Sequence, residues 1–347
     1  MKIEDSVKLD FCDVLIRPKR SVLASRSEVS LEREFTFLWS KQKWKGIPIM
    51  TSNMDTIGTL SMVSKWTTFW MIGCFHKFFQ PNEILEFLHE HPHAVSNSCL
   101  SIGMRDGDMQ YGREVLQQCP DLRMILIDVA NGYSEKFTDY IKEARQSWPN
   151  HIIMAGNVVT AEMTEALLLA GADVVKIGIG SGSVCTTRKV TGVGYPQLSA
   201  IMECADAAHG MGGHIIADGG CVSPGDVAKA FGAGSDFVML GGMLAGHDEC
   251  EGEVIEERDG KKMLFYGMSS ETAMRTHYGH VASHRAPEGK AVYVPYKGSV
   301  DKTIQEILGG VRSCCTYTGA RTLKSLPKCT TFIRVNRQLN TIFGDSQ

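Results

Sequence analysis

Residues 152–177, IIMAGNVVTAEMTEALLLAGADVVKI, contain the repeating unit from which the fold can be predicted. Short apolar runs at the two ends of this stretch, residues 152–155 and 174–177, predict two buried β-strands. Residues 161–170 between them predict a helix, because Thr160 is a suitable N-cap and Gly171 a suitable C-cap. A strand, a helix and a second strand in succession are typical of a parallel sheet.

Comparable apolar runs recur along the chain and give eight candidate strands, at residues 47–52, 71–74, 95–102, 124–128, 152–155, 174–177, 214–217 and 237–240. Successive strand starts are separated by 24, 24, 29, 28, 22, 40 and 23 residues, so every interval has room for a helix and two loops. Eight such units predict an α/β fold, a closed parallel (β/α)8 or TIM barrel, and an open doubly wound sheet is the competing architecture. In a barrel, reactive groups are expected in the loops that follow the strands, and the 40-residue interval is expected to hold an enlarged functional loop.

The composition is that of an ordinary folded protein. The 347 residues include 36 Lys and Arg against 39 Asp and Glu, a net charge of −3, which argues against nucleic acid or a membrane surface as a partner. Hydrophobic residues make up 43%, enough for a sizeable core. The chain has no evident secretory signal, no apolar run of about 18 residues and no C-x-x-C pair among its 11 cysteines. We therefore expect a soluble protein of the reducing cytoplasm, without a disulfide framework or structural zinc.

The loop after the sixth predicted strand, residues 178–188 with the sequence GIGSGSVCTTR, carries the strongest chemical signal. Its alternating glycines permit unusual backbone angles and the close approach of a ligand. Cys185, beside two hydroxyl groups and an arginine, is a candidate nucleophile, and an inert buried thiol is the alternative. A dinucleotide fingerprint is not supported, because its last glycine would fall on Ser183. The residues alone leave open whether the loop binds a cation through carbonyl oxygens or an anion through amide groups.

Paired glycines follow the seventh and eighth predicted strands, in ADGG at residues 217–220 and LGGM at residues 240–243. Barrel enzymes often bind phosphate at these two loops, so the pairs predict a phosphorylated ligand, and turn glycines without a ligand are the alternative. Asp218 is placed to accept hydrogen bonds from ribose hydroxyls. Asp128 and Lys77, each after another strand, are candidates for a polar ring at the barrel mouth, although single strand-end charges are commonly caps or solvated.

The segment after the eighth strand, residues 246–294, is interpreted as an insertion. Arg258-Asp259-Gly260 predicts the turn of a hairpin, and residues 279–290 are polar enough for a mobile flap. Residues 304–312 predict a closing helix. Elsewhere, the run HEHPH at residues 89–93 is interpreted as a solvated loop and not a metal site, because Pro92 breaks helical spacing.

The loop GIGSGSVCTTR, followed by TGVGYPQLSA and ECADAAHG, resembles the shared core of the IMP dehydrogenase and GMP reductase family. The strings DVLIRPKR, SNMDT, IDVANGYSE, AGNVVT, FYGMSS and TTFIRV extend the resemblance nearly from end to end. IMP dehydrogenases usually insert a regulatory CBS domain after the second βα unit, and the strand spacing here leaves no room for one. The resemblance therefore implies a single barrel over residues 1–347, with an insertion at about 246–295 and a closing segment at about 300–347.

The resemblance also favours the reductase branch of the family. It implies an oxidoreductase of purine nucleotide interconversion, which converts GMP to IMP and ammonia with NADPH through a Cys185 thioimidate. Thr187 and Glu288 are the implied proton relay, because ammonia leaves only if it receives a proton. An IMP dehydrogenase without its regulatory domain and a catalytically silent nucleotide-binding protein are the alternatives.

The remaining site residues are carried over from the family motifs. GMP is expected at Ser183, Asp218, Gly219, Gly220, Gly241, Gly242, Met268, Ser269, Ser270, Arg285 and Gly289. NADPH is expected at Ser25, Arg26, Lys77, Asp128, Val129, Ala130, Ile179 and Gly180 and, from a neighbouring subunit of a homotetramer, at Ser313, Cys314, Cys315 and Thr316. A potassium ion is expected on carbonyl groups of Gly180, Gly182 and Cys185. Two positions depart from the family, Ser181 where proline is usual and Phe78 where histidine is common; without proline, the loop is expected to be more flexible.

Overall fold

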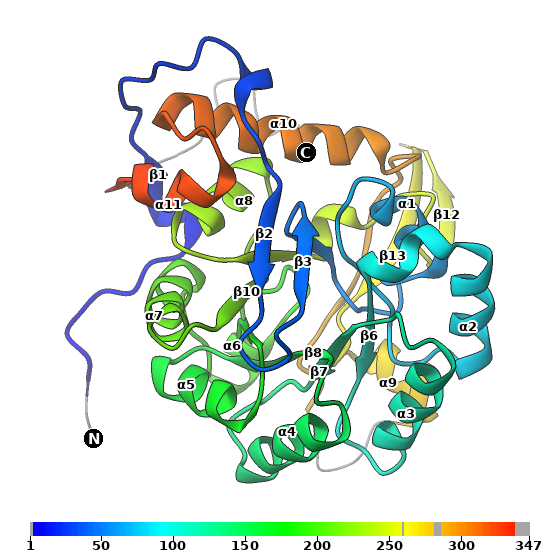
Figure 1. Ribbon diagram of the computed structural model, residues 1–347. Coiled ribbons are helices and arrows are strands. Elements are labelled where there is room, and N and C mark those ends of the chain that lie inside the picture. Colours follow the sequence, from blue (N-terminus) through cyan, green and yellow to red (C-terminus); the bar gives the residue numbers. More distant parts are fainter. Residues whose placement is uncertain (1–2, 259, 281–285, 337–347) are drawn as a thin grey trace.

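The computed structural model of the protein describes residues 3–258, 260–280 and 286–336 (Figure 1). Eight parallel strands form one sheet in the order β4-β11-β10-β9-β8-β7-β6-β5. Their bounds are Ile49–Thr51 (β4), Gly73–Cys74 (β5), Ser98–Ile102 (β6), Met124–Asp128 (β7), Ile152–Val158 (β8), Val174–Ile177 (β9), His214–Asp218 (β10) and Phe237–Leu240 (β11). Backbone hydrogen bonds from Thr51 to Ile72 and from Ile72 to Ile49 join the two ends of the sheet. The sheet is therefore a barrel, and the open doubly wound alternative is excluded.

One helix follows each barrel strand and packs on the outside of the sheet (Figure 1). These helices are Leu60–Thr67 (α1), Pro81–Glu90 (α2), Asp108–Gln118 (α3), Glu135–Ser147 (α4), Ala161–Ala170 (α5), Gln197–Gly210 (α7), Pro224–Gly232 (α8) and Asp301–Thr318 (α10). The helix predicted from residues 161–170 is confirmed, with Thr160 as N-cap and Gly171 as C-cap. The hydroxyl of Thr160 accepts a hydrogen bond from Tyr133 and caps no backbone amide. The closing helix predicted at residues 304–312 is confirmed within the longer α10.

Some predicted strand bounds were wrong. The strand expected at residues 71–74 is only Gly73–Cys74, and the strand expected from residue 95 begins at Ser98. The second difference arises because Pro92–Asn97 forms a 3-10 helix, for which the proline at its start fixes a suitable backbone angle. β8 extends three residues beyond the apolar run, to Val158. Chain segments near strand ends pair according to tertiary contacts that an apolar pattern does not contain.

Side chains of the barrel strands alternate between two cores. In β7, Met124 and Leu126 belong to an interior cluster, whereas Ile125 and Ile127 pack in the larger cluster shared with the helices. The interior cluster also contains aromatic side chains from a hairpin that precedes the barrel, formed by β2 (Arg33–Thr36) and β3 (Lys43–Gly46). Phe35 of this hairpin stacks on Phe237 at the start of β11, with ring centroids 4.5 Å apart. The hairpin therefore closes the amino-terminal end of the barrel and leaves chemistry to the opposite end.

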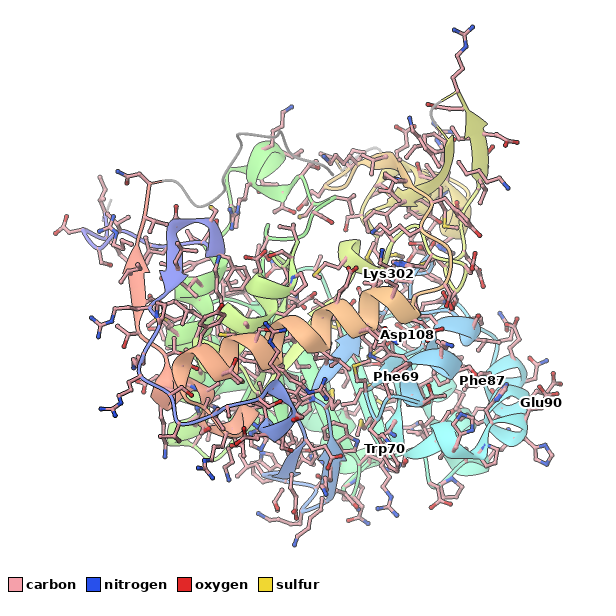
Figure 2. All side chains as sticks on the ribbon, turned by 90° about the horizontal axis from the view of Figure 1, so that it is seen from above. Phe69, Trp70, Phe87, Glu90, Asp108 and Lys302 are labelled. Carbon is pink, nitrogen blue, oxygen red and sulfur yellow. The ribbon has the colours of Figure 1, made fainter. Side chains whose placement is uncertain are left out.

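The two ends of the barrel are built from different parts of the chain (Figure 2). The blue β2–β3 hairpin lies at one end, and the small green helix α6 (Thr187–Thr191) and the yellow hairpin β12–β13 lie at the other. The predicted insertion contains β12 (Val254–Glu257), β13 (Gly260–Tyr266), α9 (Glu271–Tyr278) and β14 (Ala291–Pro295), and its three strands form an antiparallel sheet. The hairpin turn expected at residues 258–260 is confirmed by the pairing of Glu257 with Gly260, although Asp259 itself lies outside the described residues.

The remaining elements join the two ends of the chain. β1 (Val14–Ile16) pairs antiparallel with β15 (Phe332–Arg334), and α11 (Leu326–Cys329) precedes β15. Short 3-10 helices span Phe11–Asp13 (η1), Arg26–Glu28 (η2), Pro92–Asn97 (η3), Gly242–Leu244 (η4) and Leu323–Ser325 (η5). Within the described part of the chain, no helix has the length and apolar character needed to cross a membrane.

Candidate active site

Three polar side chains form a continuous chain of contacts at the carboxyl-terminal end of the barrel. The Cys185 Sγ lies 3.2 Å from the Thr187 Oγ1, and that hydroxyl donates to the Glu288 Oε2 over 2.7 Å. Cys185 is half-buried, and it lies in the long loop between β9 and α7 that the strand spacing had indicated. Residues that are 101 positions apart in the sequence therefore come into direct contact. The arrangement can transfer a proton between a sulfur atom and a carboxyl group through one hydroxyl.

Backbone hydrogen bonds hold these side chains in place. The Thr186 amide donates to the Glu288 carbonyl over 2.8 Å, and the Glu288 amide donates to the Ser269 carbonyl over 3.0 Å. The Lys290 amide then donates to the Val184 carbonyl over 2.9 Å. The segment at residues 286–290 thus lies between the segment at residues 267–270 and the loop at residues 178–188, which carries the candidate nucleophile Cys185 and is called the nucleophile loop below. This junction brings together Cys185, Thr187, Met268, Ser269, Ser270, Glu288 and Gly289.

Glycines allow the loops to approach one another closely beside this junction. The Ser183 hydroxyl occupies the space that a Cβ on Gly242 would need. Gly219 has φ +94, and a Cβ there would lie 2.5 Å from the Ser181 Oγ. A cavity of about 390 Å³ adjoins Ser183 and Gly242 and is lined in part by Cys221, Lys290, Lys297 and Glu306. Hydroxyl, backbone amide and ammonium groups around such a cavity suit a phosphate group.

The Ser181 side chain ties the nucleophile loop to the next strand. Its hydroxyl donates to the Asp218 carbonyl over 3.1 Å. The Gln197 amide group donates to the same carbonyl over 3.2 Å and to the Ile177 carbonyl over 2.9 Å. In this chain, therefore, a hydrogen bond restrains residue 181, the position at which family members usually have a proline.

A buried lysine inside the barrel connects the ends of three strands. The Lys176 Nζ lies 2.8 Å from the Asp128 Oδ1 and 2.6 Å from the Asp218 Oδ2, and its side chain is 4% exposed. Asn53 donates to the other oxygen of Asp128 over 3.1 Å, and Asn157 donates to Asp218 over 2.9 Å. The two carboxylates are therefore fixed in position and both retain some exposure at the barrel mouth.

The ionisation of this cluster follows from its charges. Burial by itself would lower the pKa of Lys176, but the two carboxylates raise it above its ordinary value. Burial would likewise raise the pKa of Asp128, but the positive charges of Lys176 and Lys77 outweigh that effect and lower it. Lys176 is therefore an ammonium ion and Asp128 a carboxylate across the physiological pH range.

Comparison with known proteins agrees with this geometry. A model of the IMP dehydrogenase / GMP reductase domain matches residues 8–340. The chain belongs to this family. It is 58% identical over 345 residues to the GMP reductases of Yersinia pestis (strain Pestoides F) and Yersinia pseudotuberculosis (serotype O:1b, strain IP 31758). These alignments cover 99% of this chain and 99% of each relative.

The residues carried over from the family for the substrate lie mainly around the nucleophile loop. Gly219 and Gly220 follow β10, and Gly241 and Gly242 follow β11, as the strand-end argument required. Met268, Ser269 and Ser270 lie on the segment that contacts Glu288 and Gly289. Arg285 lies outside the described residues.

The residues carried over for the cofactor form two groups. Asp128 is the last residue of β7, and the others lie on loops that follow β5, β7 and β9 at the active-site end: Lys77, Val129, Ala130, Ile179 and Gly180. Ser25 and Arg26 at η2 pack instead beside α10, which carries Ser313, Cys314, Cys315 and Thr316. No hydrogen bond or ion pair among the described residues joins the second group to Cys185, Lys77 or Asp128. Cys315 is fully buried within the chain.

Sequence reasoning missed three members of the site: Lys176, Asn53 and Asn157. The signal for Lys176 was a single lysine in the otherwise apolar strand VVKI, where an unpaired charge would be costly. Asn53 and Asn157 stand directly after apolar runs in SNMDT and AGNVVT. Neither pattern indicates which carboxylates the side chains contact, because those partners are 75 and 61 residues away.

Proposed function

We propose that this chain is an NADPH-dependent reductase that converts GMP to IMP and ammonia. Two observations support this proposal: the contact chain from Cys185 through Thr187 to Glu288, and the name GMP reductase carried by relatives that are 58% identical over 99% of the chain. The cavity beside Ser183 and Gly242, which Lys290 and Lys297 also line, would take the nucleotide phosphate. Asp218, held by Lys176 and Asn157, would accept hydrogen bonds from the ribose hydroxyls.

In the first half-reaction, the Cys185 sulfur attacks C2 of the purine and the C2–N bond to the amino group breaks. The thiol proton passes through the Thr187 hydroxyl to Glu288 and then to the departing nitrogen, which leaves as ammonia. The sulfur is then bonded to C2 as a thioimidate. Covalent catalysis of this kind replaces one difficult substitution with two easier steps.

In the second half-reaction, C2 accepts a hydride, the C–S bond breaks and the sulfur leaves as a thiolate, which takes a new proton from solvent because the first one left with ammonia. NADPH, when bound, supplies the hydride. Lys77 and Asp128 would hold it, because an ammonium and a partly exposed carboxylate face the active-site end and suit its phosphate, amide and ribose groups. Residues 313–316 of α10 would contact the dinucleotide of a neighbouring subunit in a homotetramer. Ser25 and Arg26, also proposed for the dinucleotide, lie at η2, which packs against the same helix.

A potassium ion fits the oxygen-rich backbone of the nucleophile loop. The proposed ligands are carbonyl groups of Gly180, Gly182 and Cys185, and hard cations prefer such oxygens. Gly180 has φ +80, and the Gly182 carbonyl accepts a 3.0 Å hydrogen bond from the Cys185 amide. These two features show that the backbone of the loop turns within residues 180–185. The ion would fix the loop conformation and supply no redox chemistry.

The proposal extends to the organisation and location of the protein. We propose one catalytic unit over residues 1–347, with the insertion at the carboxyl-terminal end of the barrel. All 11 cysteines are free thiols, which supports a reducing cytoplasmic environment.

The decisive assay incubates the purified protein with GMP and either NADPH or NADH, and follows cofactor oxidation and ammonia release together. Equal rates of both signals with NADPH are expected, and the Cys185→Ala variant should show no turnover while it still binds GMP. Formation of NADH from IMP and NAD, without turnover of GMP, would instead identify an IMP dehydrogenase. Binding of GMP without any turnover would identify a silent nucleotide-binding protein.

A further inference from the structure

Two histidines and an aspartate converge at the end of the barrel opposite to the active site. His209 is in the last turn of α7, His214 is the first residue of β10, and Asp236 directly precedes β11. The Asp236 Oδ2 lies 2.8 Å from the His209 Nε2 and 3.5 Å from the His214 Nδ1. We propose that these three side chains bind a transition-metal ion of the Zn²⁺ type.

The distances between the ligand atoms suit tetrahedral coordination. Zinc lies about 2.0–2.2 Å from imidazole nitrogen and carboxylate oxygen, which places neighbouring ligands of a tetrahedron about 3.3 Å apart. The two separations of 2.8 and 3.5 Å bracket this value, and one candidate ligand atom from each of the three residues lies within 4.8 Å of the other two. Small side-chain movements would therefore admit the ion. In the part of the chain that the structure describes, no other three His, Cys, Asp or Glu side chains converge in this way.

The surroundings of His214 orient the correct nitrogen. Its Nε2 lies 3.4 Å from the Thr36 carbonyl in β2, to which it can donate a hydrogen bond. Its Nδ1 is buried, has no hydrogen-bond partner and faces the carboxylate. A metal-binding histidine commonly donates its second ring nitrogen to a backbone carbonyl, which leaves the first nitrogen as the ligand. The His214 Nδ1 is therefore the ring nitrogen that faces the Asp236 carboxylate, 3.5 Å from its Oδ2.

The surroundings of Asp236 hold the carboxylate in place. Arg33 donates to its Oδ1 over 3.0 Å, and the Ile215 amide donates to its Oδ2 over 3.1 Å. Outer contacts of this kind orient a metal-binding carboxylate and keep it ionised. The Asp236 side chain is 3% exposed, whereas that of His209 is 46% exposed. Water can therefore reach the ion from the His209 side and complete its coordination.

The site would connect three structural elements and would have no part in the proposed reaction. An ion on His209, His214 and Asp236 joins the end of α7 to the starts of β10 and β11, and Arg33 extends the connection to β2. The expected effect is stabilisation of the closed end of the barrel, because a ligand that binds only the folded chain favours it.

The test measures Zn²⁺ binding by equilibrium dialysis. The unaltered chain is compared with His209→Asn, with His214→Asn, with the double variant and with His93→Asn, which removes an exposed histidine from the 3-10 helix η3. Because the two histidines share one ion, each single variant and the double variant should bind one Zn²⁺ per chain fewer than the unaltered chain. His93→Asn should bind as many as the unaltered chain. Affinity at this site should fall at least about 10-fold in each single variant.

A spectroscopic readout separates this site from zinc bound by thiols. Co²⁺ added to the unaltered chain should give a tetrahedral ligand-field spectrum, and the His214→Asn variant should lack that contribution. Circular dichroism shows whether each variant is folded. Equal Zn²⁺ stoichiometry and affinity in all five proteins would overturn the proposal and leave the cluster as a histidine–carboxylate ion pair. Because the readouts are metal content and spectrum, the result is independent of any reductase activity.

Discussion

Acidification is expected to destabilise this protein through one buried histidine, His76, which follows β5. Burial lowers the pKa of His76 from 6.5 to about 4. The contacts of the ring agree with a neutral imidazole: its Nδ1 accepts a 3.2 Å hydrogen bond from the Phe78 amide, and the ring stacks on Phe79 with centroids 3.8 Å apart. A proton on Nδ1 would remove that acceptor.

The sign and size of the effect follow from the two pKa values of His76. Between pH 6.5 and about 4, the unfolded chain binds more protons at this residue than the folded chain, so the free energy of unfolding falls as the pH falls. Above pH 6.5, His76 is neutral in both the folded and the unfolded chain, and its full contribution to the free energy of unfolding is present. At pH 5 the loss amounts to about 2 kcal/mol, and it approaches about 3 kcal/mol as the pH falls through 4.

Urea denaturation at pH 7.5 and at pH 5 measures this contribution. The His76→Asn variant keeps a side-chain acceptor for the Phe78 amide but cannot titrate, so its stability should fall between the two pH values by about 2 kcal/mol less than that of the unaltered chain. His93→Asn, which removes an exposed histidine, should behave like the unaltered chain. Parallel pH dependence of His76→Asn and the unaltered chain would refute the reasoning.

Three further substitutions test the site. Glu288→Gln should lower the rate of ammonia release about 10²- to 10⁴-fold, with a smaller effect on hydride transfer, because the proton relay through Thr187 serves the departing nitrogen; single-turnover kinetics would separate the steps, and equal impairment of both would contradict the role. Lys176→Met should lower the free energy of unfolding by about 3–5 kcal/mol, since it leaves two carboxylates without their shared cation; a loss below about 1 kcal/mol in urea denaturation would show that the cluster relaxes or binds a proton. Ser181→Ala should lower the free energy of unfolding by about 1 kcal/mol, because it removes the hydrogen bond to the Asp218 carbonyl. Ser181→Pro should be about as stable as the unaltered chain, because the lower entropy of the unfolded loop offsets the same loss. Thermal unfolding that ranks the proline variant below the alanine variant would contradict this account.

The sequence was informative about the fold because the barrel repeats one simple unit. Apolar runs located all eight strands, and the long interval before residue 214 located the loop that carries Cys185. The β2–β3 hairpin was missed, although Phe35 and Trp44 fill the interior of the barrel. Its strands are four residues each and alternate only partly, so their apolar side chains acquire a role only once the barrel exists to receive them.

The site was predictable where its residues are adjacent in the sequence and unpredictable where the fold brings them together. Cys185 and Thr187 share one loop, and their chemistry could be inferred from the residue types. The contact with Glu288 was inferred only through the family resemblance, because it depends on backbone pairing between segments about 100 residues apart. Ser181 shows a further limit of sequence reasoning. A serine where the family usually has proline predicts a more flexible loop, but the structure shows that the serine hydroxyl is hydrogen-bonded to the Asp218 carbonyl.

The buried position of Lys176 supports a functional role better than a stabilising one. Transfer of one ammonium and two carboxylates from water costs several kcal/mol for each ion, and apolar side chains of similar volume are often equally stable or more stable in such positions. A barrel interior selected for stability alone would therefore favour an apolar residue between β7 and β10. The ion cluster instead fixes two carboxylates, Asp128 and Asp218, at the mouth of the barrel on opposite sides of one lysine. A triple variant with apolar residues at all three positions should therefore fold, yet lose affinity for both GMP and NADPH.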